Sequence, residues 1–141
     1  MRAKLREIAQ AAQDDPTEAL IASMPEAAGQ YEVFHNRVLV ATYVRPEKTK
    51  GGIILADRTL AEDRFQGKVG LVIKVGPMAF VDSPIASFGG VTIEPGDWVT
   101  YVPSNGTEVF FVDENGLDAT PCRLIEDSNI LGRTPDPALI Y

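Results

Sequence analysis

The chain has 141 residues, a formal net charge of −7 and an isoelectric point near 4.6. Hydrophobic residues make up 45% of the chain and charged residues 23%, which is typical of a folded globular domain and long enough for one modest core plus an appendage. The acidity argues against a nucleic-acid-binding protein, because such proteins rely on cationic contacts with phosphates.

Several other classes are excluded by residue counts and local patterns. The single cysteine, Cys122, rules out an intrachain disulfide, and with the single histidine, His35, it cannot make the usual four-ligand zinc site. The apolar runs are too short for a membrane span, and the charged N-terminus is not followed by the apolar core of a secretory signal. We therefore expect a cytoplasmic protein without cofactor, metal, nucleic acid or membrane.

Residues 1–30 are expected to form a helical N-terminal extension. The first helix has an apolar stripe at helical spacing, made by Leu5, Ile8, Ala9 and Ala12. A second helix begins around Asp15 and Pro16, which suit a cap and a first turn. Its expected stripe is Leu20, Ile21 and Met24, and Pro25 and Gly29 are expected to end it. Helices this short are marginal in water, so we expect them to dock on the rest of the chain.

Residues 31–132 read as a mainly β domain. Short strands are expected at residues 38–44, 67–75, 98–102, 109–112 and 123–125, and residues 113–116 carry a hairpin-turn signal. Short strands that are separated by turn-forming residues, with no long helices between them, favour a small β-barrel. Gly132 is expected to close any helical turn after Asp127. Residues 133–141, with two prolines, are expected to form an extended C-terminal tail.

Five motifs in this region occur in an order that resembles the co-chaperonin (chaperonin 10, GroES-like) family. They are a strand opening at His35, a Gly-Gly-Ile-Ile-Leu loop, a glycine-bounded Val-rich strand, a Pro-Gly-Asp turn and a closing Asn-Ile-Leu, found at residues 35–40, 48–55, 67–76, 94–99 and 123–131. The resemblance implies a GroES-like β-barrel whose copies form a ring, a heptamer if it is family-like. It also implies that this ring caps a chaperonin 60 ring and assists ATP-dependent protein folding, without catalytic activity of its own.

The loop at residues 48–55 is the expected chaperonin-binding site. The resemblance assigns docking to Gly51, Gly52, Ile53, Ile54 and Leu55. Its physics is compatible with that role, since two glycines keep a free loop disordered. Each aliphatic side chain buried in a partner contributes roughly 1.5–3 kcal/mol before ordering costs. Identical loops on one ring add avidity. From the pattern alone, the same residues could instead form a turn entering a buried strand.

The resemblance also implies a subunit interface between the first strand of one copy and the last strand of the next. The residues at these positions are Arg37, Val38, Leu39, Val40, Ile130 and Leu131. Gly132, Pro135 and Pro137 shorten the last strand, because proline removes ladder donors. The sequence therefore leaves undecided whether the ring closes, unless residues 138–141 supply the contact.

Two segments depart from the family pattern. The N-terminal extension has no family counterpart, which favours a divergent, phage-encoded version. Residues 77–92 occupy the place of the family's polar roof hairpin but are apolar, with Met78, Phe80, Val81, Ile85 and Phe88 as a candidate partner surface. Alternatively, this segment folds onto its own barrel or onto the N-terminal helices.

The leading hypothesis is thus a phage-type co-chaperonin in the host cytoplasm. The alternative is a structural or assembly protein of a phage particle, such as a head or tail accessory protein in the virion, that no longer binds chaperonin. Cys122 lies beside an apolar strand and is interpreted as a buried structural thiol, although the adjacent Arg123 could lower its pKa.

Overall fold

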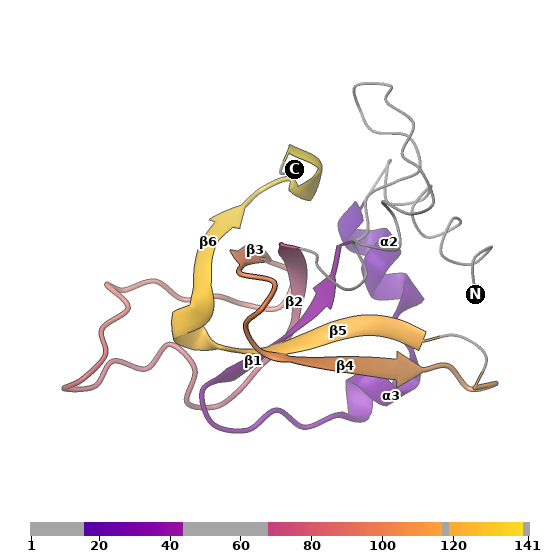
Figure 1. The fold of residues 1–141 in the computed structure, drawn as a ribbon, viewed down its shortest axis with the longest axis horizontal. Coiled ribbons are helices and arrows are strands. Elements are labelled where there is room, and N and C mark those ends of the chain that lie inside the picture. The colour runs from indigo at the N-terminus through magenta and orange to yellow at the C-terminus, as the bar shows by residue number, and fades with distance from the viewer. Residues whose placement is uncertain (1–15, 44–67, 117–118, 140–141) are drawn as a thin grey trace.

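The computed structural model describes residues 16–43, 68–116 and 119–139 (Figure 1). The helices are α2 (Pro16–Ser23) and α3 (Glu26–Gln30), with two 3-10 turns, η1 (Asp127–Asn129) and η2 (Pro137–Leu139). The strands are β1 (Arg37–Thr42), β2 (Val69–Val75), β3 (Trp98–Tyr101), β4 (Thr107–Val112), β5 (Ala119–Glu126) and β6 (Ile130–Thr134). The first predicted helix, with Leu5 and Ile8, lies outside the described residues.

The strands form one six-stranded antiparallel sheet in the order β4-β5-β1-β2-β3-β6. The mainly β prediction is confirmed, and α2 confirms the second of the two predicted N-terminal helices. The predicted hairpin is also present, since β4 and β5 pair with Val112 opposite Ala119 and the amide of Gly116 donates to the carbonyl of Asp113. β1 lies at the centre, paired on one side with β2 and on the other with β5.

Both faces of the sheet are buried at the central strand β1, whose successive side chains point to opposite faces. Val38 and Val40 of β1 point into one cluster, which also contains Val72, Val99, Tyr101 and Ile125. Leu39 and Ala41 point into the other, with Leu71, Trp98, Phe111 and Cys122. The sheet is strongly twisted, so that β6 stands across the direction of β4 and β5 in Figure 1.

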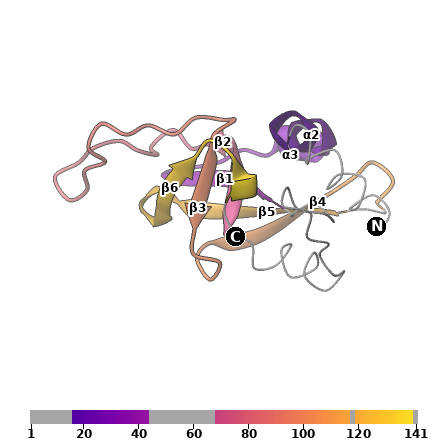
Figure 2. The ribbon, with the colours of Figure 1, turned by 90° about the horizontal axis from the view of Figure 1, so that it is seen from above.

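The extension covers the second of these faces (Figure 2). Leu20 and Ala28 are buried in the cluster around Trp98. The Trp98 indole N–H donates to Thr17 Oγ1 at 2.8 Å, and the Lys74 ammonium donates to the carbonyls of Gly29 and Tyr31 at 2.5 and 2.7 Å. The expectation that these short helices dock on the rest of the chain is confirmed, and the extension completes the core.

Two details of the helices refine the prediction. Pro25 separates α2 from α3, as expected of a residue without an amide donor. Gly29, predicted as a stop, instead lies inside α3, which continues to Gln30. The carbonyl of Gly29 is bound by Lys74, a long-range contact that local sequence does not reveal.

The C-terminal part of the prediction was wrong in one respect. Gly132 does not end a helical turn; it lies within β6, opposite Thr100 of β3. Thr134 closes β6 and η2 follows, with Pro137 buried, so the described residues 133–139 form a strand end and a 3-10 turn where an extended tail was expected. Pairing with β3 supplies hydrogen bonds that override the weak local preference of glycine.

β5 is also longer than expected and contains Pro121. β5 pairs with β1 from Glu126 to Cys122, so Pro121 lies one residue beyond the paired stretch. Among the described residues, Pro121 is paired only with Phe110 of β4, and a position without a second neighbouring strand tolerates the missing amide donor.

Candidate functional site

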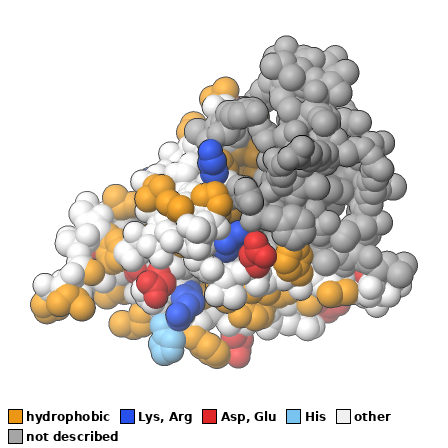
Figure 3. Space-filling model, viewed as in Figure 1, with side chains coloured by type: hydrophobic (Ala, Val, Ile, Leu, Met, Phe, Trp, Pro, Cys, Tyr) orange, Lys and Arg blue, Asp and Glu red, His pale blue; other side chains and the backbone are white. Residues whose placement is uncertain are grey.

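The segment between β2 and β3 projects from the body of the molecule, at the left of Figures 1 and 2. Ile85 is 97% exposed, Met78 57% and Val81 48%. Figure 3 shows hydrophobic side chains at the end of this projection. The predicted candidate partner surface is therefore largely on the outside of the single chain. That it binds a partner stays a prediction.

The two aromatic residues of this surface form its base. The rings of Phe80 and Phe88 meet edge to face with centroids 5.4 Å apart, and both side chains are half-buried. Phe80 also packs against the cluster that contains Val99 and Ile125. The alternative prediction, that this segment folds back on its own domain, thus holds for Phe80 but not for the exposed Met78.

Asp127 anchors the projection to the sheet. Its carboxylate is buried and accepts hydrogen bonds from the amide of Phe80 at 3.0 Å, the side-chain amide of Asn36 at 3.1 Å and the amide of Ser128 at 2.7 Å. Phe80 has φ of 60°, the left-handed region that side chains rarely adopt. Hydrogen bonds to an ionised carboxylate are strong, so Asp127 holds this turn where the projection leaves the domain.

The projection has internal order as well. The Phe88 amide donates to Asp82 Oδ1 at 2.8 Å, and the Ser83 amide donates to the carbonyl of Ala86 at 2.8 Å. These bonds close a small turn around Ile85. Sequence reasoning identified the apolar residues of this segment but not Asp127, whose role depends on three segments meeting in space.

Gly76 marks the close approach of the projection to the start of β1. Its amide donates to the carbonyl of Arg37 at 2.8 Å, and the Met78 amide donates to the carbonyl of His35 at 2.9 Å. A Cβ on Gly76 would lie 2.5 Å from the His35 carbonyl oxygen, so only glycine fits without a backbone shift. His35 therefore contributes to this site through its backbone.

The predicted subunit-interface residues fall into two groups. Val38, Leu39 and Val40 are fully buried between β2 and β5. The Arg37 side chain is 46% exposed, 4.0 Å from Glu126, while Leu131 is 66% exposed on β6 and Ile130 is half-buried. Arg37 and Leu131 are thus the members of the set most accessible to another copy, and the interface itself stays a prediction.

The predicted chaperonin-binding residues 51–55 lie outside the described residues. The described chain stops at Tyr43 and resumes at Lys68, and these ends are close because the Tyr43 amide donates to the Val69 carbonyl at 2.9 Å. The segment that contains the Gly-Gly-Ile-Ile-Leu motif therefore departs from and returns to the same end of the sheet.

The residues considered for chemistry are structural. Cys122 is buried, as predicted, and burial raises the pKa of its thiol from 9.0 to about 12. The Arg123 guanidinium points instead to Glu108 at 3.1 Å and the Asn105 carbonyl at 3.1 Å, with its carbon 5.9 Å from the Tyr101 ring centre. Burial also raises the pKa of Tyr101.

The described ranges contain neither a metal-ligand cluster nor a membrane-spanning helix. Across residues 16–43, 68–116 and 119–139, His, Cys, Asp and Glu side chains do not gather in groups of three or more that could hold a metal ion. In the same part of the chain, no helix is both long and apolar enough to cross a bilayer.

Comparison with known proteins points to one family. The model of the chaperonin 10 Kd subunit matches residues 30–133, from the end of α3 to the end of β6. The chain is 34% identical over 107 residues to co-chaperonin GroES 3 of Bradyrhizobium diazoefficiens, covering 76% of this chain and 91% of the relative. It is 33% identical over 102 residues to co-chaperonin GroES of Methylocella silvestris (72% and 95%). It is 31% identical over 106 residues to that of Allorhizobium ampelinum (75% and 96%).

Proposed function

This chain belongs to the chaperonin 10 (GroES) family, and on that premise we propose that its copies assemble into a ring that caps a chaperonin 60 ring and assists ATP-dependent folding. The observation that carries the proposal is the family match from residue 30 to residue 133, which spans β1 to β5 and all of β6 except Thr134. The protein has no catalytic step in this role; it closes a chamber in which the chaperonin acts.

Docking is assigned to Gly51, Gly52, Ile53, Ile54 and Leu55. The support is their sequence and the position of their segment, which leaves and re-enters the sheet where Tyr43 pairs with Val69. A loop tethered at both ends can reach a partner without disturbing the sheet. Three aliphatic side chains on each loop bind weakly, and several loops on one ring bind with avidity.

Ring contacts are assigned to the predicted set from Arg37 to Val40, with Ile130 and Leu131. Within this set, the exposed Leu131 on β6 and the exposed Arg37 at the start of β1 offer accessible side chains. The buried Val38, Leu39 and Val40 support the interface by holding β1 in place. A heptamer is the stoichiometry expected from the family.

The proposal is tested by native mass spectrometry of the protein alone and with a chaperonin 60 and ADP. We expect a ring, and a nucleotide-dependent complex with the chaperonin. The triple variant I53S/I54S/L55S is expected to keep the ring and lose the complex, because it removes the docking side chains only. Val102→Ser, which changes one exposed aliphatic residue after β3, serves as the matched control and is expected to bind normally.

Two results would overturn the proposal. One is unaltered capping by the triple variant, which would show that the loop is not the docking element. The other is a protein that ignores chaperonin in every nucleotide state. In that case the structural role in a phage particle becomes the hypothesis to test, by asking whether the protein co-purifies with assembled particles.

A further inference from the structure

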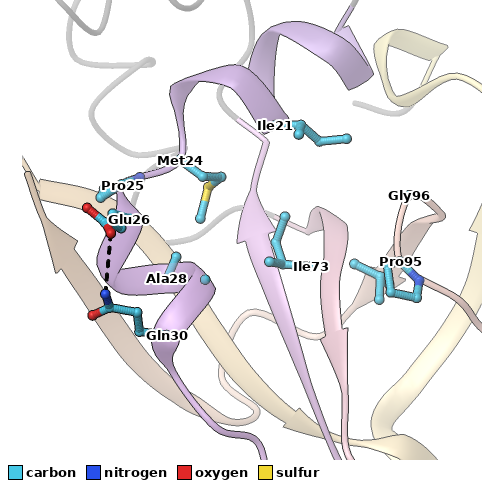
Figure 4. A pocket seen from close by; sticks show the side chains of 11 residues that line it. Ile21, Met24, Pro25, Glu26, Ala28, Gln30, Ile73, Pro95 and Gly96 are labelled. Carbon is cyan, nitrogen blue, oxygen red and sulfur yellow. Dashed lines mark hydrogen bonds between the residues drawn. The ribbon is translucent and has the colours of Figure 1, made fainter.

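An apolar groove runs along the seam between the extension and the β domain (Figure 4). Its volume is about 520 Å³, enough for several aliphatic side chains. Ile21 faces it from α2 and Met24 from the link between α2 and α3. Ile73 faces it from β2, and Pro95 from the turn before β3. Ile21 is 51% exposed there, so this part of the apolar wall is accessible to a further segment.

The walls of this groove are held in place. Lys74, next to Ile73 in β2, binds the carbonyls of Gly29 and Tyr31 and so fixes the end of α3. The hydrogen bond from Trp98 to Thr17 fixes the start of α2, and Leu20 is buried beneath it. The groove is therefore a defined feature of the docked extension, because hydrogen bonds and buried side chains fix both of its walls.

We propose that this groove is occupied by residues 1–15 of the same chain, which fold back along α2 and bury an apolar stripe in it. The stripe consists of Leu5, Ile8, Ala9 and Ala12, which share one face at helical spacing. Two large and two small side chains suit a groove whose walls carry Ile21, Met24 and Ala28.

The length of the segment and its point of attachment allow this. α2 begins at Pro16, so 15 residues precede it, and as a helix they would span roughly 22 Å. α2 itself has 8 residues, roughly 12 Å. The segment can therefore reverse direction before Pro16 and still run the full length of α2 to reach Met24.

Charge favours the same occupant. Glu26 is the charged residue among those described as lining the groove, and it lies at the exposed rim. The first six residues of the chain carry three cations, Arg2, Lys4 and Arg6, and no acidic residue. In the reversed orientation these cations approach the α3 end of the groove, while the acidic Asp14 and Asp15 stay near the start of α2.

The test is paramagnetic relaxation from a nitroxide on an Ala3→Cys variant of the full chain. The label is selective because the native thiol, Cys122, is buried. We expect the methyl signals of Met24, Ile21 and Ile73 to broaden at least threefold more than those of Val102 and Ile85. Residue 3 lies 13 positions before Pro16, so a free tether would broaden signals around α2 in general, without the selectivity expected for a segment seated in the groove.

A matched pair of variants in the labelled protein separates the stripe from general charge effects. Ile8→Asp places a carboxylate on the stripe and is expected to abolish the broadening. Gln10→Asp places the same charge on the opposite face of the helix and is expected to preserve it. Both lie outside the described sheet and its core, so either variant should fold.

The measured broadening distinguishes the chain's own residues 1–15 from the same segment of a second copy as the occupant of the groove. Broadening that is independent of concentration and lost in Ile8→Asp supports the proposal. Broadening seen only when labelled and isotope-enriched copies are mixed would assign the groove to a second copy's segment and overturn it, as would no broadening at Met24. None of these results involves chaperonin, so the inference stands or fails separately from the co-chaperonin function.

Discussion

Buried polar residues in this protein act as local anchors. Asp127 joins Asn36, Phe80 and Ser128, while Arg123 joins Glu108 to the Asn105 carbonyl. Charged groups are rarely buried unless they are paired. Both residues follow this rule, and each holds together segments distant in sequence. Removing Asp127 would leave the part-buried donors of Asn36, Phe80 and Ser128 without this acceptor, a cost larger than the loss of one bond.

Cys122 gives a prediction at the same scale. Burial raises the pKa of its thiol to about 12, so the native state keeps a proton that the unfolded state loses at about pH 9. The contribution to stability is therefore complete below pH 9 and is lost as the pH rises toward 12. Tyr101, whose pKa is also raised by burial, acts in the same direction.

We expect the free energy of unfolding to fall over this range, with up to about 1.4 kcal/mol per pH unit from one proton. Urea denaturation of the protein and of Cys122→Ala at pH 8 to 11 measures this free energy. It should fall less steeply with pH in the variant. A thiol reagent at pH 8 should label the native protein far more slowly than the unfolded protein. Rapid native labelling would contradict the assignment.

At the scale of elements, the short helices depend on the sheet. α2 has 8 residues and α3 has 5, too short to persist alone in water. Packing of Leu20 and Ala28 and the bonds from Trp98 and Lys74 supply the missing stability. The Lys74 ammonium also sits at the C-terminal end of α3, where exposed carbonyls favour a cation.

The role of Lys74 predicts a selective effect of its removal. Lys74→Met keeps the aliphatic part of the side chain but loses both hydrogen bonds to α3. We expect a loss of about 1–2 kcal/mol in stability, together with faster hydrogen exchange in residues 16–30. Lys68→Met is the control, because Lys68 precedes the same strand but its side chain is exposed. Equal effects of the two variants would show that Lys74 is not an anchor.

At the scale of the whole molecule, the extension is part of the core of this family member. The family match begins at residue 30, whereas the sheet face around Trp98 is covered by residues before that point. A chain cut at residue 30 would retain the matched region but expose this face. In this chain the β domain therefore depends on the extension to cover the sheet face around Trp98.

Deletion of residues 1–30 is therefore expected to be costly. Burial of the Leu20 and Met24 side chains alone corresponds to about 3 kcal/mol or more. Thermal denaturation and binding of a hydrophobic dye measure the effect, and we expect a lower melting temperature with increased dye binding. Deletion of residues 1–15 alone leaves α2 and α3 in place, so we expect it to cost less than deletion of residues 1–30. A chain lacking residues 1–30 with unchanged stability would refute this account.

The sequence by itself determined strands β1 to β5, the β4–β5 hairpin, the short helix before Pro25 and the family. These depend on local information: alternation of apolar residues, turn residues such as those at 113–116, and motifs in order along the chain. The apolar residues of the projection could be read in the same way, because composition alone distinguishes Ile85 and Met78 from a polar hairpin.

Only the tertiary structure decided the rest. Gly132 was expected to end a turn, but β3 lies beside it and supplies a ladder of hydrogen bonds. Asp127 and Lys74 became anchors because their partners are 47 and 45 residues away in sequence. Which face the extension covers likewise follows from the packing of Leu20 and Ala28. Such contacts depend on where distant segments meet in space, and local sequence patterns do not contain that information.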